Sequence, residues 1–371
     1  MIVITKFENL FSQSVPLQLE CGAELDSVTV AYQSYGTLNK EKNNVIIVNH
    51  ALTGNAHAAG IIEDIEIKNS EKYPKLYSYN KMFDGKEGWW SPLIGSGKPL
   101  DTDKYFIICS NILGSCYGTT GPTSLNLKTN SIYGMNFPEI TVRDMVKVQK
   151  ALLAKLGINK ITLAIGGSLG GMQVLEWAIM YPDLVDKIMP IATSAAHSAW
   201  AIGLNEASRN AIINDPVWNN GNYKHQPEKG IGLARKIAMI SYRSFDSFNK
   251  KFSRGFNHKE NIFEIESYLN YQGEKLTNRF DANAYLYLSK AMDYHDVGKD
   301  RNGITNALSL IKAKTKCVGI NSDNLYPVAE QKEIQSQIPN ADYTEIDSIH
   351  GHDAFLIEFD QLDQIIRKFL D

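Results

Sequence analysis

The segment Gly166-Gly167-Ser168-Leu169-Gly170-Gly171 restricts the fold of this chain more than any other feature of its sequence. An apolar run at 161–165 precedes it, and a helical pattern over 169–181 follows it. A strand that turns sharply into a helix needs small residues on both sides of the turn, because the backbone of the central serine is strained and its neighbours approach closely. The sequence therefore predicts a nucleophile elbow that presents the Ser168 hydroxyl at a helix N-terminus, where partial positive charge stabilises a developing anion.

Two other interpretations of this segment are weaker. A glycine-rich turn can allow a helix to pack closely on a sheet without any catalytic role. A phosphate-binding loop fits less well, because no Lys-Ser or Lys-Thr pair follows the glycines. The strand-like run before the segment and the helical pattern after it favour the elbow.

Several short apolar runs, rich in β-branched residues, have the pattern of strands buried on both faces. Among the helical patterns between them, 141–157 is the clearest: Thr141 and Asp144 make a capping-box-like start, and Gly157 can end the helix in a left-handed conformation. Alternation of strands and helices predicts an α/β fold, with a mostly parallel sheet covered by helices on both faces. The apolar runs are 45–48, 105–109, 161–165, 188–191 and 316–320.

The alternation stops between about 194 and 310. This stretch contains an Asn/Gly-rich segment at 219–222, many aromatic residues and several helical patterns, but no convincing buried strand. A helical insert between two strands of one sheet forms a cap over that sheet rather than a separately linked domain. We therefore expect a core made of residues 1–193 and 311–371, with an inserted helical cap, or lid, at 194–310.

A serine hydroxyl needs a base to act as a nucleophile, and after an elbow of this kind an acid and then a histidine follow along the chain, each just after a strand. Asp323 and His352 satisfy this order, since each follows a strand-like run. His352 would accept the Ser168 proton and later return it to a leaving group, while Asp323 would fix the imidazole tautomer and stabilise its cation. Spacing alone leaves His350 as an alternative base. A metal role for this His-x-His pair is weak, because no motif places a third ligand.

Acyl chemistry also needs N–H donors for the oxyanion that forms in the transition state. One donor would be the N–H of Leu169, the residue after the nucleophile, and the second would come from the loop after an earlier strand. The run at 45–48 leads into Asn49-His50-Ala51-Leu52-Thr53-Gly54, where Gly54 permits a tight loop, so the N–H of Leu52 is the candidate. An ordinary strand-to-loop turn is the alternative.

Composition argues against several classes of protein. With 38 Lys and Arg against 41 Asp and Glu, the net charge of -3 gives no global bias toward nucleic acid or an acidic membrane. No apolar run approaches the ~18 residues of a membrane-spanning helix, and the N-terminus lacks a secretory pattern. The four cysteines form no C-x-x-C pair, which predicts reduced thiols in a cytoplasmic protein without structural zinc. Cys116, in a glycine-rich stretch, is best explained as a buried structural thiol.

These motifs together resemble the homoserine O-acetyltransferase family, whose members are acyltransferases with the α/β-hydrolase fold. Leu169 stands where many members of the family have Met, a change that affects only side-chain packing. The matching segments span most of the chain. They are 50–54, 111–114, 120–122, 137–144, 166–173, 322–327 and 351–356.

The resemblance implies roles that the residues alone leave open. It selects His352 over His350 as the base, and it supports Leu52 as an oxyanion donor. It implies that Arg209 binds the carboxylate of an amino-acid substrate and that Asp353 binds the substrate ammonium group. From sequence alone, these two would be a surface helix residue and an ordinary strand-end acid. The resemblance also implies a homodimer formed through the cap, and an active site reached by a tunnel between cap and core.

The resemblance therefore predicts a ping-pong transfer of an acetyl group from acetyl-CoA, through an acyl-serine, to the side-chain hydroxyl of L-homoserine in methionine biosynthesis. Acetyl-CoA would be a co-substrate, with no permanently bound cofactor. Three alternatives stay open: a succinyl donor or a serine acceptor on the same fold, a small-ester hydrolase, and a scaffold that has lost its chemistry. The triad alone does not separate transfer from hydrolysis, because the two differ only in the second nucleophile. The sequence does not show where the CoA head group binds.

Overall fold

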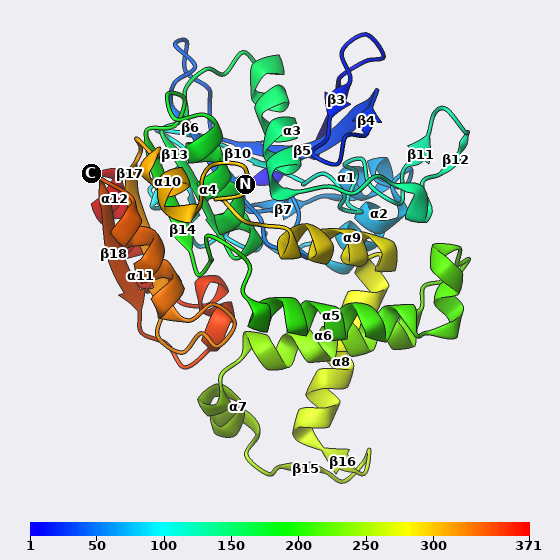
Figure 1. The fold of residues 1–371 in the computed structure, drawn as a ribbon. Helices are drawn as coiled ribbons and strands as arrows, with labels where there is room; N and C mark the ends of the chain where they lie inside the picture. The colour runs from blue at the N-terminus through cyan, green and yellow to red at the C-terminus, as the bar shows by residue number, and fades with distance from the viewer.

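The structure is a computed structural model that describes residues 1–371. Its centre is an eight-stranded sheet. The strand order is β18 (Ala341–Ile346), β17 (Lys314–Ile320), β14 (Lys187–Ile191), β13 (Leu163–Gly167), β6 (Val45–Asn49), β10 (Phe106–Ser110), β5 (Val28–Tyr35) and β2 (Lys6–Leu10). The strands from β18 to β10 are parallel to one another, while β5 and β2 add an antiparallel edge. Helices cover both faces of this sheet (Figure 1).

The central strands of the sheet are buried on both faces, as their continuous apolar runs predict. Every residue of β6 is buried, with Val45 and Ile47 in one hydrophobic cluster and Ile46 and Val48 in another. Successive side chains of a strand point to opposite faces, so the two clusters are the cores on the two sides of the sheet. The predicted α/β fold is confirmed.

The helices that flank the sheet include the one read most clearly from the sequence. The helix α3 (Val142–Lys155) begins with a complete capping box formed by Thr141 and Asp144. It is followed by Gly157 with φ 73°, in the left-handed region. The other helices outside the inserted stretch are α1 (Asp64–Asn69), α2 (Pro74–Met82), α4 (Leu169–Met180), α11 (Val328–Gln337) and α12 (Phe359–Leu370).

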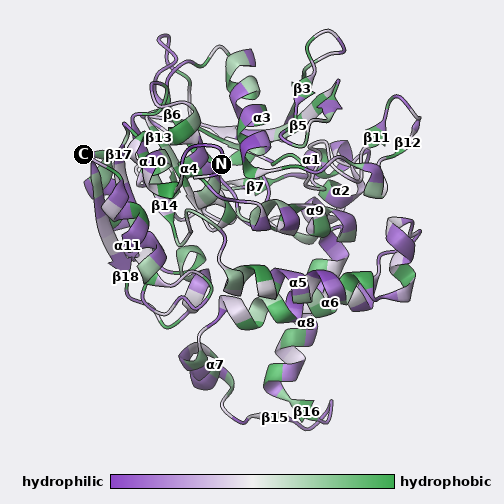
Figure 2. Cartoon of the chain, in the orientation of Figure 1, coloured by the Kyte–Doolittle hydropathy of each residue, from purple (hydrophilic) through white to green (hydrophobic).

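A helical layer lies between β14 and β17 in the chain. In Figure 1, its helices α5, α6 and α8 run below the sheet and pack on one another, and Figure 2 shows apolar and polar residues alternating along them. The last helix of the stretch, α10, packs on α11. The division into core and cap at 194 and 310 stays a prediction. The elements are α5 (Ala199–Ile213), η2 (Pro216–Gly221), α6 (Glu228–Tyr242), α7 (Phe245–Phe252), β15 (Phe256–Asn257), β16 (Ile262–Phe263), α8 (Glu264–Arg279), α9 (Ala282–Asp293) and α10 (Ile304–Ser309).

Local sequence patterns missed some elements and displaced others. The strand expected at 161–165 is β13, which begins at Leu163 and extends through Gly166 and Gly167. These glycines pair with β14, so tertiary pairing overrides the low strand propensity of glycine. The antiparallel strands β5 and β2 and several two-residue strands were not anticipated. The short strands are β1 (Ile2–Val3), β3 (Leu17–Gln18), β4 (Glu24–Leu25), β7 (Ile61–Ile62), β8 (Ile94–Gly95), β9 (Leu100–Asp101), β11 (Leu125–Asn126) and β12 (Ser131–Ile132).

None of the helices combines the length and the apolar character that crossing a membrane requires.

Candidate active site

Ser168 lies at the junction of β13 and α4 in a strained backbone conformation. Its φ of 58° and ψ of -127° fall outside the regions that residues with a Cβ normally occupy. Two hydrogen bonds hold this conformation: the Ser168 N–H donates to the Ile191 carbonyl at 3.0 Å, and the Thr193 hydroxyl donates to the Ser168 carbonyl at 2.9 Å. The end of β14 therefore fixes the serine at the start of α4, as the elbow prediction requires.

The glycines after the serine allow α4 to approach the neighbouring loops. A methyl group on Gly170 would collide with the carbonyl oxygen of Asn49, and one on Gly171 would lie 2.7 Å from the Cβ of Thr193. Glycine is therefore required at both positions for steric reasons, because rigid backbone or a β-branched side chain occupies the space.

Asp323 and His352, which are 29 positions apart in the chain, are in direct contact. The Asp323 Oδ2 lies 2.7 Å from His352 Nδ1, and both residues are buried. The other carboxylate oxygen, Oδ1, accepts the N–H groups of Leu325 and Tyr326 at 2.8 and 3.0 Å. Asp323 follows β17, and His352 lies in the 3₁₀ helix η3 (Gly351–Leu356) after β18, so adjacent strands bring the pair together.

The structure shows no hydrogen bond between the reactive atoms of the serine and the histidine. His352 Nε2 has no hydrogen-bond partner within the chain, and neither it nor Ser168 Oγ is among the fully buried unpaired atoms. Tyr326 lies beside both residues: its hydroxyl is a hydrogen-bonding neighbour of the Ser168 side chain, and its ring centroid is 5.2 Å from that of His352. His352 Nε2 is therefore free to accept a proton.

The electrostatic surroundings of His352 favour a basic imidazole. Burial alone lowers the pKa of His352, but attraction to Asp323, the hydrogen bond from Nδ1 and the nearby Asp353 outweigh it, and the net pKa is raised. A raised pKa makes the neutral imidazole a better proton acceptor, which is the property that general-base catalysis needs.

His350, the alternative base, lies in a different environment. Its Nδ1 is 3.4 Å from Arg243 Nη1, and the structure places His352 rather than His350 against Asp323. No group of three or more His, Cys, Asp or Glu side chains is arranged to hold a metal ion.

The two candidate oxyanion donors lie in suitable backbone positions. The N–H of Leu52, in the loop after β6, donates to no group in the chain, and Leu169 is the first residue of α4, where N–H groups have no partner within the helix. Buried Gln173 joins the two segments, because its Nε2 donates to the carbonyl oxygens of His50 at 3.3 Å and Leu169 at 3.1 Å. Gln149 in turn donates to Gln173 Oε1 at 2.7 Å. This amide network holds the loop against the elbow, and no sequence pattern beyond the 166–173 motif predicts it.

Comparison with known proteins identifies the family. A family model described as alpha/beta hydrolase fold matches residues 44–359. The chain is 48% identical to the homoserine O-acetyltransferase of Moorella thermoacetica, over 100% of this chain and 96% of that protein. It is 49% identical to the homoserine O-acetyltransferase of Methanococcus vannielii, over 95% of this chain and 70% of that protein. The chain belongs to the homoserine O-acetyltransferase family. The predictions of the family and of the α/β-hydrolase fold are confirmed.

Solved structures place the homoserine O-acetyltransferase family near esterases. The homoserine O-acetyltransferase from Bacillus anthracis matches with a TM-score of 0.87 and 28% identity, over 99% of this chain and 98% of that one. Esterase E22 matches with a TM-score of 0.86 and 28% identity, over 100% of both chains. The fold of the family therefore serves proteins named for transfer and for hydrolysis, and fold alone does not distinguish the two reactions.

Arg209 and Asp353, the two predicted substrate-binding residues, already have charged partners within the protein. Arg209 is buried on α5, and its Nη2 lies 2.6 Å from Asp293 Oδ2 and 2.7 Å from Glu206 Oε2. Its Nη1 has only a long contact, 3.5 Å, to the Ser289 hydroxyl, and is the donor left for a ligand. Asp353 is adjacent to His352 in the chain and pairs with the guanidinium of Arg243 at 3.3 Å. The structure does not bring Arg209 and Asp353 into contact with each other.

A chain of contacts that sequence reasoning missed links Arg209 to the nucleophile. Asp293 lies 3.3 Å from His197 Nδ1, and His197 Nε2 lies 2.9 Å from the hydroxyl of Tyr326, which neighbours Ser168. Tyr326 lies in the motif 322–327, and Arg209 lies in a cap segment, 205–210, that resembles the family, whereas His197 and Asp293 lie in no such motif. His197 has no local pattern of its own, so the connection is visible only in three dimensions.

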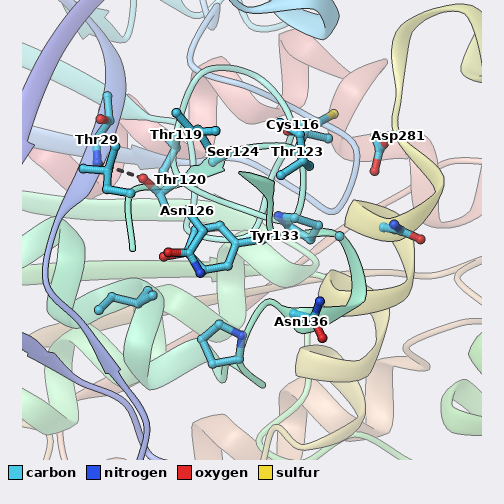
Figure 3. A pocket seen from close by; sticks show the side chains of 18 of the residues that line it. Thr29, Cys116, Thr119, Thr120, Thr123, Ser124, Asn126, Tyr133, Asn136 and Asp281 are labelled. Atoms are coloured by element: carbon cyan, nitrogen blue, oxygen red, sulfur yellow. Dashed lines mark hydrogen bonds between the residues drawn. The ribbon is translucent and has the colours of Figure 1, made fainter. Parts of the chain in front are cut away.

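A large cavity in this homoserine O-acetyltransferase family member lies outside the catalytic site. Its volume is about 1310 Å³, and Ser168, Asp323 and His352 do not line it. Figure 3 shows its wall of hydroxyl and amide side chains, including Thr119 and Asn126, with Cys116 at one side. Burial raises the pKa of the Cys116 thiol to about 12, so this thiol stays protonated and unreactive at neutral pH.

Proposed function

We propose that this protein transfers an acetyl group from acetyl-CoA to the side-chain hydroxyl of L-homoserine. The observation that carries the proposal is the contact between Asp323 and His352 beside the Ser168 elbow, in a chain 48% identical over its full length to a homoserine O-acetyltransferase. Methionine biosynthesis is the pathway in which this reaction belongs.

The first half-reaction forms an acyl-enzyme. His352 Nε2 takes the proton of Ser168 as Oγ attacks the thioester carbonyl of acetyl-CoA. The N–H groups of Leu52 and Leu169 stabilise the oxyanion. When the tetrahedral intermediate collapses, the C–S bond breaks, and the imidazolium gives its proton to the departing thiolate, so that CoA leaves as the thiol.

The second half-reaction returns the enzyme to its starting state. His352 takes the proton of the homoserine hydroxyl, and the oxygen attacks the acetyl carbonyl on Ser168. Collapse of the second tetrahedral intermediate breaks the bond to Ser168 Oγ, which recovers its proton from the imidazolium. The product is O-acetyl-L-homoserine, and neither half-reaction needs a permanently bound cofactor.

Selection of the amino acid over water depends on positioning. Water is present at ~55 M, but effective molarities on the order of 10⁵ M or more are available to groups held in reactive geometry. We assign the substrate carboxylate to Arg209, through its Nη1, and the ammonium group to Asp353, which follows His352 in the chain. The partners of Arg209, the largely buried Asp293 and the exposed Glu206, would then orient the guanidinium rather than block it.

Hydrolysis of small esters is the second candidate, because esterase E22 has the same fold over its full length. Both candidates share the first half-reaction, and they differ in the acceptor. Steady release of thiol from acetyl-CoA without any amino acid would favour hydrolysis. Release that requires homoserine would favour transfer.

Removal of the nucleophile tests the proposal directly. Ser168→Ala should abolish the mass increment that acetyl-CoA produces on the intact protein, because no other group forms the acyl-enzyme. Wild-type protein should then be assayed with acetyl-CoA or succinyl-CoA as donor and homoserine or serine as acceptor, following free thiol and acylated product. Normal turnover by Ser168→Ala would refute the mechanism, and a preference for succinyl-CoA or serine would change the substrate assignment.

Two wider properties belong to the same proposal. We place the protein in the cytoplasm, which agrees with four cysteines that form no disulfide. We also propose a homodimer formed through the cap, because large apolar side chains are exposed on its helices, a feature of association surfaces. These side chains are Trp200, Leu233, Ile240, Phe245 and Tyr271. Sedimentation of the purified protein as a monomer at micromolar concentration would argue against the dimer.

A further inference from the structure

Four cationic side chains gather around the cap helices α6 and α8. They are Lys86, Arg235, Lys275 and Arg279, and we refer to them as the basic cluster. Lys86 follows α2, Arg235 lies on α6, and the other two lie on α8. The Nζ atoms of Lys86 and Lys275 are 5.6 and 5.3 Å from the ring centroid of Phe83. The two ammonium groups therefore share one aromatic ring.

The remaining two members of the basic cluster adjoin the same site. Arg279 Cζ lies 6.0 Å from the ring of Tyr79, which stacks on Phe83 with a centroid distance of 4.5 Å. Arg235 approaches from α6, which packs closely on α8 where Gly273 meets Gly232. Its charge acts on Lys275, as do those of Lys86 and Arg279.

No member of the basic cluster is in contact with a carboxylate, and Asp353 is a carboxylate on which the charge of Arg235 acts from further away. None of its members forms an ion pair with a carboxylate, whereas five other arginines of the chain do. Burial lowers the pKa of Lys275, and the cations Arg279, Lys86 and Arg235 lower it further, with no carboxylate opposing them. Like charges held together without counter-charge destabilise a protein unless an anion binds there.

The basic cluster borders the groups assigned to the acyl transfer. Arg279 Nη1 donates to the carbonyl oxygen of Thr53 at 2.8 Å, one residue beyond Leu52. On the other side, Arg235 Cζ lies 5.6 Å from the ring of Tyr242, whose centroid is 5.6 Å from that of His352. A ligand that reaches Ser168 between the Leu52 loop and His352 would therefore extend past these cations.

We propose that the basic cluster binds the phosphate groups of the nucleotide head of acyl-CoA. The inference rests on the proposed function, which supplies a donor with a thioester at one end and three phosphate groups at the other. Guanidinium groups match phosphate oxygens as bidentate donors, and lysine adds compact positive charge. The unpaired charge of the cluster and the hydrogen bond from Arg279 to the loop that contains Leu52 fit this one ligand.

Donors with and without phosphate groups test the proposal. Arg235→Ala and Lys275→Ala should each raise the KM for acetyl-CoA about tenfold, the effect expected when one charged hydrogen bond is lost. The kcat/KM for S-acetyl-pantetheine, which has no nucleotide head, should stay unchanged. The readout is thiol release during the first acylation of Ser168, which needs no acceptor. Arg254→Ala is the matched control, because Arg254 is an exposed cap arginine that packs over Phe263, outside the cluster.

Two results would overturn the proposal: an equal loss with both donors, or no change with acetyl-CoA. Calorimetric titration adds a measurement that does not depend on catalysis. CoA should bind wild-type protein more tightly than pantetheine does, and the two variants should remove this difference; equal affinities in wild type would refute the site. If acetyl-CoA acylates Ser168 but homoserine is not acetylated, the proposed function fails while the phosphate site stands.

Discussion

Asp323 uses its two carboxylate oxygens for different purposes. Oδ1 accepts two backbone N–H groups and fixes the turn after β17, whereas Oδ2 contacts His352 Nδ1 at 2.7 Å. The carboxylate is therefore oriented by the backbone before it orients the imidazole. Around the ring, Tyr242, Tyr326 and Phe355 lie at centroid distances of 5.6, 5.2 and 5.5 Å. These aromatic side chains exclude water from the ring of His352, while its Nε2 stays open.

The pH dependence of acylation follows from the raised pKa of His352. Only the neutral imidazole accepts the Ser168 proton, so the rate should rise with pH through a midpoint above the ordinary histidine value of about 6.5. Asp323→Asn removes the negative charge and leaves the effect of burial, so the midpoint should move to lower pH and the rate should fall by about 10³–10⁴. Single-turnover thiol release between about pH 5 and 9 measures both. A midpoint unchanged by the substitution would show that another group titrates.

At the scale of elements, sequence patterns predicted those helices and strands whose formation depends on residues close together in the chain. The helix α3 was predictable because its capping box and Gly157 lie within one short stretch, and the buried strands because their apolar runs are continuous. The contact between Asp323 and His352 was predictable from chain order, since adjacent parallel strands end at the same edge. The link from Arg209 through His197 to Tyr326 joins separate elements without any sequence pattern, and so does the basic cluster.

The crossing of α6 and α8 provides a prediction about packing. A Cβ on Gly273 would lie 2.9 Å from the carbonyl oxygen of Gly232, so Gly273→Ala should force the helices apart and destabilise the protein by about 1–3 kcal/mol. Gly203→Ala on α5 is the matched control, because a Cβ there meets nothing within 4 Å. Removing a helix-interior glycine at that exposed site should stabilise by about 0.5–1 kcal/mol. Urea unfolding measures both, and stabilisation of both variants would show that the crossing tolerates a methyl group.

At the scale of the whole molecule, three buried histidines resist protonation. Burial lowers the pKa of His50 and His57 to about 4 and, together with nearby cations, that of His295 to about 3. The hydrogen bonds of His50 agree with this: Nδ1 contacts the Ala51 carbonyl at 2.8 Å, and Nε2 accepts the Ile112 N–H at 3.2 Å, which leaves no site for a second proton. All three histidines are less than one-tenth exposed.

Acid should therefore destabilise the fold through these three histidines. The unfolded chain binds protons at these histidines below about pH 6.5 while the folded chain does not, so stability should fall as pH drops from about 6.5 to about 4, by roughly 3 kcal/mol for each histidine. The contribution of His352 to the pH dependence of stability has the opposite sign. Its raised pKa adds stability at low pH, and this stability is lost as the pH rises through that pKa. His295→Asn should remove about one histidine's share of the slope of unfolding free energy against pH, whereas His258→Asn, at an exposed position, should leave it unchanged. Equal slopes in wild type and His295→Asn would mean that His295 is protonated in the folded protein.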